Sequence, residues 1–207
     1  QLTTGYFNGD LIGKYTYNFD YRQLGTWGRA SDVNHVGEWV VISSNEYMNN
    51  GPTMCEYSQG EGLMYNNFIS NHYDNVGITV PATANWTMVF GPWALYFNSD
   101  STADAAWQDA QNQSVAEKAA WPYTWLTNPA YATAAQRATV TGHLTITDPL
   151  RPNVSAAGAW VGLAAPESAT ENAPDNWQFQ SDRYQYWVQA DANGNFTIPG
   201  VCVTDTY

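Results

Sequence analysis

Cationic side chains are scarce in this sequence, so each one is a candidate for a catalytic or binding role. The 207 residues contain seven Lys and Arg against nineteen Asp and Glu, a formal net charge of -12. Lysine occurs twice, and Lys118 fits the surface of a helix. Lys14 instead follows Gly13 in a strand-like run and is followed by Tyr15 and Tyr17. An edge lysine that discourages strand pairing and an active-site cation are both consistent with that setting.

His72 is the second candidate, because it lies in an aromatic and amide-rich run at residues 65–73. This histidine is either satisfied by a neighbouring carbonyl or part of a polar face suited to sugar hydroxyls. The chain also holds ten tryptophans and fourteen tyrosines. Their rings either fill a β-sandwich core or serve as platforms for the apolar side of a pyranose ring.

Other catalytic constellations are absent or weak. There is no Gly-x-Ser-x-Gly elbow and no glycine loop for phosphate. His35, His72 and His143 lack the spacing of metal ligands, so we expect neither a metal nor a cofactor.

A pair of carboxylates for glycoside hydrolysis remains an open alternative. Glu46, Glu56 and Glu61 share the first region of the chain with several aspartates. The acidic net charge disfavours nucleic acid and anionic membranes as partners. No apolar run of about eighteen residues occurs, so no transmembrane helix is predicted.

The composition predicts a secreted, extracellular glycoprotein. Only 13% of the residues are charged, and the polar surface must come from uncharged side chains. Four Asn-x-Ser/Thr sites are predicted to carry glycans: Asn85, Asn112, Asn153 and Asn195. Cys55 and Cys202 are candidates for a disulfide with each other, or for pairing with other chain.

The first hundred residues predict an antiparallel sheet region. Short β-branched and aromatic runs alternate with turns at residues 15–21, 38–47, 76–80 and 86–98. Half of each strand is expected to face the core. In the last run, Trp93, Leu95 and Phe97 share one face, and Gly91-Pro92 interrupts the strand.

A helix is predicted for residues 101–121, with Ser101 as its N-cap and Pro122 ending it. Its buried stripe has helical spacing: Trp107, Ala110, Ser114, Lys118 and Trp121. The two tryptophans are expected to pack the helix against a sheet, and residues 129–136 to form a loop or linker.

From residue 137 the chain predicts a small β-domain with strands at 139–147, 159–164, 184–190 and 195–198. The turn from Asp191 to Gly194 has hairpin chemistry. Four strands are fewer than an immunoglobulin-like sandwich needs. We therefore expect missing chain or a partner subunit to complete the fold.

The predicted class is mainly β: an antiparallel β-sandwich region at 1–100, a helix and linker at 101–136, and an incomplete immunoglobulin or fibronectin-III-like β-domain at 137–207.

The order of ten motifs resembles that of rhamnogalacturonan endolyases of polysaccharide lyase family four. The motifs lie at residues 13–15, 36–47, 50–52, 65–72, 90–98, 116–123, 137–142, 161–164, 184–188 and 191–201. The resemblance implies a partial molecule: the second half of a catalytic β-sandwich and most of a fibronectin-III-like domain.

The resemblance also assigns roles to residues. The family's catalytic lysine and histidine match Lys14 and His72, and a tyrosine at its substrate groove matches Tyr65. Fungal members often have a tyrosine where this sequence has Asn67.

The substrate that the resemblance implies is an acidic plant cell-wall polysaccharide, the rhamnose and galacturonate backbone of pectin. Cleavage by β-elimination removes the proton on carbon five of galacturonate and expels the oxygen on carbon four. We favour Lys14 as the base and His72 as its partner, with exchanged roles as the alternative. The rival function is a catalytically inactive glycosylated carbohydrate-binding or structural wall protein of the same ancestry.

Overall fold

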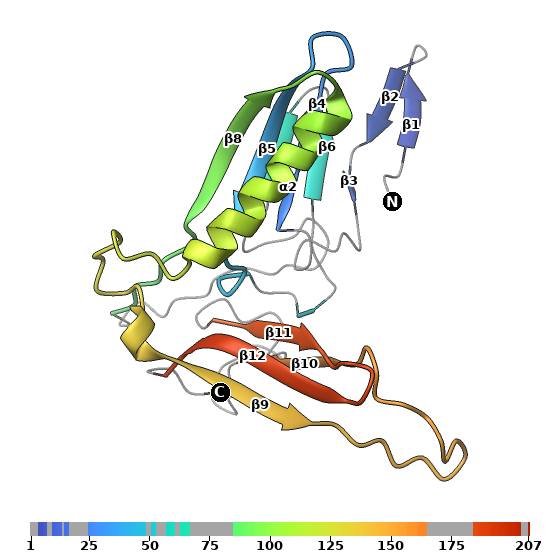
Figure 1. The fold of residues 1–207 in the computed structure, drawn as a ribbon, viewed down its shortest axis with the longest axis vertical. Helices are drawn as coiled ribbons and strands as arrows, with labels where there is room; N and C mark the ends of the chain where they lie inside the picture. The colour runs from blue at the N-terminus through green and yellow to red at the C-terminus, as the bar shows by residue number, and fades with distance from the viewer. Residues whose placement is uncertain are drawn as a thin grey trace.

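A computed structural model describes residues 25–48, 51–52, 85–164, 184–203 and 207, together with five strands nearer the N-terminus whose backbone alone is described. Within these residues the fold is mainly β, with antiparallel sheets and one α-helix (Figure 1). The predicted fold class is confirmed. The strand expected at residues 76–80 lies outside the described residues.

The larger sheet of the first region has the strand order β4-β5-β8: β4 (Thr26–Ala30), β5 (Val36–Ile42) and β8 (Trp93–Ser99). β5 is the central strand, and its residues from Trp39 to Ile42 are buried. β4 was not predicted, because Gly28 and Arg29 break its apolar alternation. A Cβ on Gly28 would come within 2.1 Å of the Glu38 carbonyl oxygen, so close strand pairing requires glycine there.

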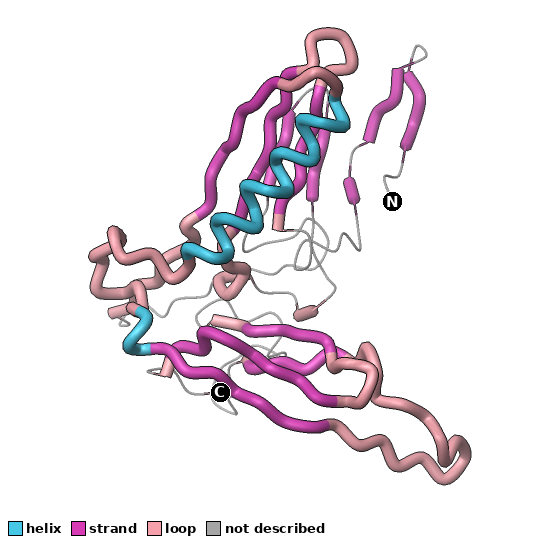
Figure 2. Tube along the Cα trace, viewed as in Figure 1, coloured by secondary structure: helices cyan, strands magenta, loops and turns pink. Residues whose placement is uncertain are grey.

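Helix α2 (Ala103–Ala120) packs along this sheet (Figures 1 and 2). Ala106, Ala110 and Ser114 form its buried face, and the Trp107 ring lies 5.2 Å from that of Trp39. The predicted helix is therefore confirmed, and Trp107 contacts the sheet as expected.

The predicted N-cap is wrong by one residue. Thr102, rather than Ser101, is the N-cap, and its hydroxyl accepts the Ala105 N–H at 3.0 Å. Ser101 instead bonds to the carboxylate of Asp100.

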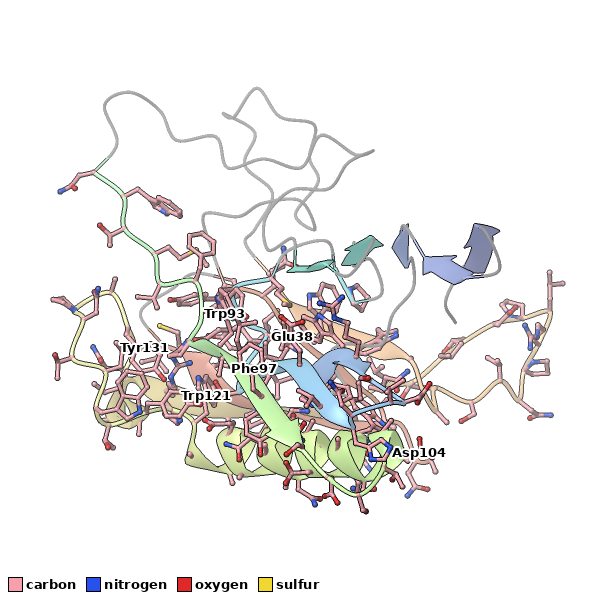
Figure 3. The ribbon with its side chains drawn as sticks, turned by 90° about the horizontal axis from the view of Figure 1, so that it is seen from above. Glu38, Trp93, Phe97, Asp104, Trp121 and Tyr131 are labelled. Carbon is pink, nitrogen blue, oxygen red and sulfur yellow. The ribbon has the colours of Figure 1, made fainter. Side chains whose placement is uncertain are left out.

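β8 carries its polar residues on the helix side. The hydroxyl of Tyr96 donates to Asp109 at 2.6 Å, and the Asn98 amide donates to the carbonyl of Ala106 at 2.7 Å. The other face holds Trp93, Leu95 and Phe97, which are 41%, 52% and 61% exposed. Figure 3 labels Trp93 and Phe97 on this strand. The expectation that half of this strand is core is therefore wrong for β8, which lies at the edge of this sheet among the described strands.

In the second region, the described residues form two two-stranded antiparallel sheets. β9 (Arg137–His143) pairs with β12 (Asn195–Cys202), and β10 (Trp160–Leu163) pairs with β11 (Tyr186–Gln189). A loop and the short 3-10 helix η1 (Ala134–Gln136) precede β9, where a linker was predicted.

The turn between β11 and β12 is present, but the strands do not form the predicted hairpin. Asp191 accepts the N–H groups of Asn193 and Asn195 on one carboxylate oxygen, and Gly194 has φ +82°. The strands then continue into different sheets. The turn therefore connects the two layers of the small β-domain.

The five backbone-only strands form two small sheets. β1 (Thr4–Phe7) pairs with β2 (Asp10–Gly13). β3 (Tyr15–Thr16), β6 (Tyr57–Gly60) and β7 (Leu63–Asn66) form a three-stranded sheet in the order β3-β6-β7. None of the helices in the described part of the chain has the length and apolar character of a membrane span.

Candidate functional site

The two residues with predicted catalytic roles, Lys14 and His72, lie outside the described residues, as does Asn67. Tyr65 lies on β7, of which the backbone is described. The side-chain geometry of the predicted catalytic site therefore stays a prediction.

The pairing register of the strands nevertheless places the backbone of Tyr15, the residue after Lys14, near that of Tyr65. Tyr15 pairs with Ser58, and Ser58 pairs with Tyr65, so these residues form one row across β3, β6 and β7. Adjacent strands lie about 4.8 Å apart, which separates the backbone of Tyr15 from that of Tyr65 by about 10 Å. Lys14 directly precedes Tyr15 in the chain. Residues 50 positions apart in sequence thus share one small sheet.

The sites predicted for modification are only partly described. All four asparagines of the glycosylation sequons are exposed: Asn85, Asn112, Asn153 and Asn195. Cys202 is buried at the end of β12, whereas Cys55 lies outside the described residues. Glycan attachment and the disulfide therefore stay predictions.

A buried ion pair joins the first region to the small β-domain. Arg137 donates from Nη1 to Oε2 of Glu46 at 2.6 Å and from Nη2 to Oε1 at 3.0 Å. The two side chains are 3% and 1% exposed. Tyr186 donates its hydroxyl to the same carboxylate at 2.8 Å. Glu46 is thus a structural carboxylate, so it is not one of the paired acids that glycoside hydrolysis would need.

All three side-chain nitrogens of Arg137 donate hydrogen bonds. Its Nε donates to the Ala132 carbonyl at 3.0 Å, and its Nη1 also donates to the Gly200 carbonyl at 2.8 Å. Burial alone would lower the pKa of Arg137, but the hydrogen bonds and charge of Glu46 outweigh it and raise the pKa. The guanidinium is therefore permanently charged and fixed in place.

Aromatic rings surround this ion pair. The Arg137 guanidinium lies 4.3 Å from the ring centroid of Trp121 and 5.5 Å from that of Tyr131. Burial raises the pKa values of Tyr184 and Tyr186, and the charge of Glu46 adds to both shifts. Trp121 was expected to pack the helix against a sheet, and it packs against Arg137 of β9 and Gly200 of β12, in the small β-domain.

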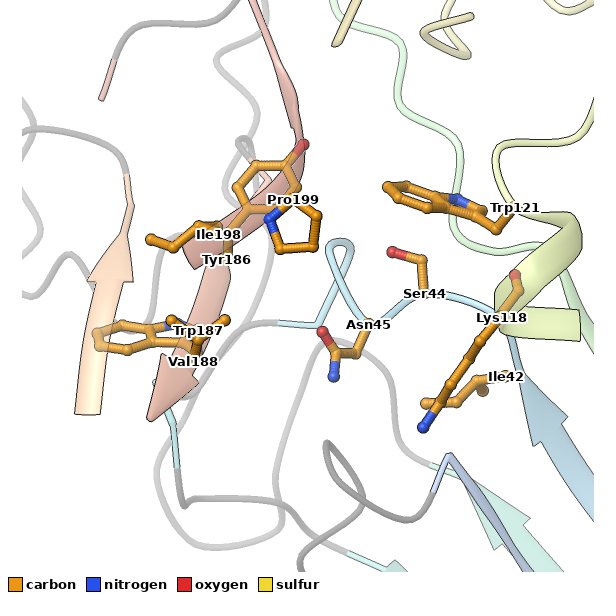
Figure 4. A pocket seen from close by; sticks show the side chains of 11 residues that line it. Ile42, Ser44, Asn45, Lys118, Trp121, Tyr186, Trp187, Val188, Ile198 and Pro199 are labelled. Carbon is orange, nitrogen blue, oxygen red and sulfur yellow. The ribbon is translucent and has the colours of Figure 1, made fainter. Parts of the chain in front are cut away.

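A cavity of about 290 Å³ lies beside this junction (Figure 4). One wall comes from β11 and β12, with Trp187, Ile198 and Pro199. The opposite wall comes from the end of α2 and the residue after it, with Lys118 and Trp121. Ile42 and the turn after β5 close the space between the walls, through Ser43, Ser44 and Asn45. No sequence motif marked this cavity, because its walls come from four distant segments.

Two ionisable groups near the end of α2 have shifted pKa values. Burial lowers the pKa of Lys118. Burial and the hydrogen bond to Glu117 raise the pKa of Tyr123 to about 12. The cavity wall therefore carries a half-buried cation, whereas the neighbouring tyrosine stays neutral at physiological pH.

Comparison with known proteins shows similarity to lyases over nearly the whole chain. A family model described as polysaccharide lyase family 4, domain II, matches residues 156–205. A rhamnogalacturonate lyase of Dickeya dadantii is 25% identical over 94% of this chain. A probable rhamnogalacturonate lyase C of Emericella nidulans is 28% identical over 96% of it, and a probable rhamnogalacturonate lyase B of Aspergillus niger is 24% identical over 93%.

The alignments cover 30%, 19% and 27% of these three relatives, so the chain spans between about a fifth and a third of their lengths. No solved structure matches the chain significantly.

Proposed function

We propose, from the premise that this chain is related to the rhamnogalacturonate lyases of polysaccharide lyase family 4, that it forms part of a secreted lyase acting on the rhamnogalacturonan backbone of pectin. The relatives carry that activity in their names and align with more than nine-tenths of the chain. We assign the same activity to this chain and its catalytic steps to residues of the chain itself.

Lys14 and His72 are the proposed catalytic pair, and Tyr65 is the proposed substrate-binding residue. The proton on carbon five of galacturonate is weakly acidic, so the main task is to stabilise the enolate-like charge that its removal creates. In the favoured assignment, Lys14 removes this proton, and His72 protonates the oxygen that leaves carbon four. Both groups are side chains of this chain, and the scheme requires no metal.

The net charge of -12 makes a local cation necessary if the substrate is a polyuronate. Lys14 supplies that charge in the exchanged assignment, where it stays protonated beside the substrate carboxylate, and in the favoured assignment once it has accepted the proton from carbon five. The observation that carries the proposal is the register of β3, β6 and β7, which aligns Tyr15, the neighbour of Lys14, with Tyr65.

The test is the release of unsaturated uronate from rhamnogalacturonan, followed by ultraviolet absorbance. We expect Lys14→Ala and His72→Ala each to reduce the rate by about 10²-fold or more, the usual contribution of a positioned acid or base. Arg151→Ala is the matched control, because it removes an exposed cation from a turn and should leave the rate within twofold. Wild-type rates in both catalytic variants would reject the assignment.

The rival function, a saccharide-binding or structural protein without turnover, is favoured by Asn67, where fungal members often have tyrosine. Binding of rhamnogalacturonan without release of unsaturated uronate would favour this rival. New reducing ends without the absorbance would instead indicate hydrolysis.

Secretion and glycosylation are part of the same proposal, supported by the exposure of all four sequon asparagines. Protein expressed through a secretory pathway should lose mass on treatment with an N-glycosidase. A mass equal to that of the bare chain before treatment would reject glycosylation.

A further inference from the structure

We propose that the cavity between the small β-domain and the end of helix α2 is a binding site for an acidic sugar, with the Lys118 cation next to a uronate carboxylate. The choice of a uronate as ligand rests on the proposed function. The described lining residues come from β5 and the turn after it, the end of α2, β11 and β12. The proposed site is an additional subsite or a product site on the same molecule.

The size of the cavity suits a small ligand. Its volume is about 290 Å³, just below the range of about 300–1,000 Å³ for small-molecule sites. A space of this size admits one or two sugar rings but not a folded peptide.

The lining has the residue types that sugars require. Trp121 and Trp187 come from opposite walls (Figure 4), and aromatic faces pack well against the apolar side of a pyranose ring. The Trp187 ring is fixed from behind, because it packs on Gly162 and its Nε1 donates to Gln185 at 3.0 Å. Trp121 is fixed by the Arg137 guanidinium. Both rings are therefore held in place before a ligand arrives.

The side chain of Asn45 lies between the two walls (Figure 4). Among the described residues, its side-chain amide makes no hydrogen bond, although its backbone carbonyl accepts the Met48 N–H at 3.0 Å. An amide supplies both donors and an acceptor, which suits the hydroxyl groups of a sugar. Ser44, whose hydroxyl accepts the Glu46 N–H at 3.2 Å, lies beside it.

The described cavity lining carries a positive charge, whereas the sequence as a whole has a negative net charge. None of the eleven described lining residues is acidic, and one of them is Lys118. Acids outnumber bases by nineteen to seven in the whole sequence. Lys118 already makes an interaction within the chain, so we assign it the attraction of its charge and no particular hydrogen bond. This local positive charge selects an acidic sugar over a neutral one.

The experiment titrates a galacturonate disaccharide into the Lys14→Ala, His72→Ala double variant, so that binding is scored apart from turnover. Binding is followed by the indole N–H signals of Trp121 and Trp187 in ¹⁵N NMR spectra, assigned with single Trp→Phe variants. Both signals should shift, and that of Trp125, an exposed ring outside the cavity lining, should not. A neutral galactose disaccharide should bind at least tenfold more weakly.

Two variants test the charge. Lys118→Met should weaken uronate binding by about tenfold, as expected for the loss of a charged partner, whereas Arg151→Met should change it by less than twofold. Asn45→Asp keeps the size of the side chain but adds a negative charge, so it should also weaken uronate binding at least tenfold and should weaken binding of the neutral sugar by a smaller factor. This second variant keeps the test decisive if Lys118→Met does not fold.

Three results would overturn the inference: no shift of the Trp121 and Trp187 signals, equal affinity for the acidic and neutral sugars, or unchanged uronate binding in both charge variants of a folded protein. Failure of the lyase assay would reject the proposed activity alone, since this binding measurement does not depend on turnover.

Discussion

Arg137 and Glu46 lie 91 positions apart and form a two-bond ion pair with both side chains almost completely buried. Arg137 opens the first strand of the small β-domain, and Glu46 follows the central strand of the first region. The Tyr186 hydroxyl also donates a hydrogen bond to the Glu46 carboxylate, and Arg137 also donates one to the Gly200 carbonyl. The contact therefore fixes the position of one β-region on the other, and with it both walls of the adjacent cavity.

Breaking this pair from one side should destabilise the protein strongly. Arg137→Met leaves the Glu46 carboxylate buried without its cation, and such losses cost about 3–5 kcal/mol. The measurement is the free energy of unfolding in urea. In the double variant Glu46→Gln, Arg137→Met, the loss should be smaller than the sum of the two single losses, because no charge is left unpaired.

Arg29 and Glu38 provide the matched comparison. They form an ion pair at 2.7 Å with side chains about one-third exposed. Because water screens this pair, Arg29→Met should cost about 1 kcal/mol or less. Equal losses in Arg29→Met and Arg137→Met would show that burial of the second pair contributes little.

The sequence predicted helix α2 well because the signal is local. Ala110 and Ser114 follow the helical period, and a proline directly after Trp121 ends the helix. The Glu46–Arg137 pair could not be predicted, since nothing in the neighbourhood of either residue identifies its partner. β4 was missed for a similar reason: Gly28 looks like a strand breaker until the close approach of β5 is known.

The candidate site shows the same difference between features with a local sequence signal and features that form only when distant segments pack together. Lys14 and His72 were singled out by residue type and setting, and a family resemblance carried by short motifs assigned roles to them and to Tyr65; these roles stay predictions. The cavity was not found, because its walls meet only when α2, β11, β12 and the turn after β5 pack together. The sequence did single out Lys118, but as a cation on a helix surface. Only the fold places it at the wall of a cavity.

The N-cap of α2 gives a test with a built-in control. Thr102→Ala removes the hydroxyl that accepts the Ala105 N–H, which should cost about 1 kcal/mol of stability. Ser101→Ala, one residue earlier, should cost a few tenths at most, because its hydroxyl bonds Asp100 outside the helix. Urea unfolding of both variants measures the difference. A larger loss for Ser101→Ala would restore the N-cap first expected from the sequence.

Asn98 links β8 to β5 and α2. Its Oδ1 accepts the Trp39 indole N–H at 2.8 Å, and its Nδ2 donates to the carbonyl of Ala106 and to Asp109. Asn98→Asp removes both donated bonds and brings two carboxylates together, so we expect a loss of about 2–3 kcal/mol at pH 7.

Part of the stability lost in Asn98→Asp should be regained as the pH falls. The introduced carboxyl group has a raised pKa, and it donates a hydrogen bond once it is protonated. Asn34→Asp is the control, since Asn34 is exposed and uses its oxygen to accept the Val36 N–H at 3.4 Å. It should leave the unfolding free energy within about 0.5 kcal/mol. A comparable loss in both variants would mean that the added charge, rather than the Asn98 bonds, sets the effect.

Alkaline pH should destabilise the fold through its buried tyrosines. Burial, together with Glu117, raises the pKa of Tyr123 to about 12, against an ordinary value of 10.0. Between these pH values the unfolded chain has lost the phenolic proton that the folded chain retains, so the unfolded state binds fewer protons and stability falls as the pH rises. Tyr184 and Tyr186, whose pKa values are also raised by burial, extend the decline to higher pH.

Urea unfolding at a series of pH values from about 9 to 12 measures this decline. Tyr123→Phe should make the slope between pH 10 and 12 shallower, because one of the contributing protons is gone. Glu117→Gln tests the cause: it should lower the Tyr123 pKa, read from its ring signals by NMR, but not back to the ordinary value, since burial is the larger cause. An unchanged slope in Tyr123→Phe would show that this tyrosine titrates alike in the folded and unfolded chains.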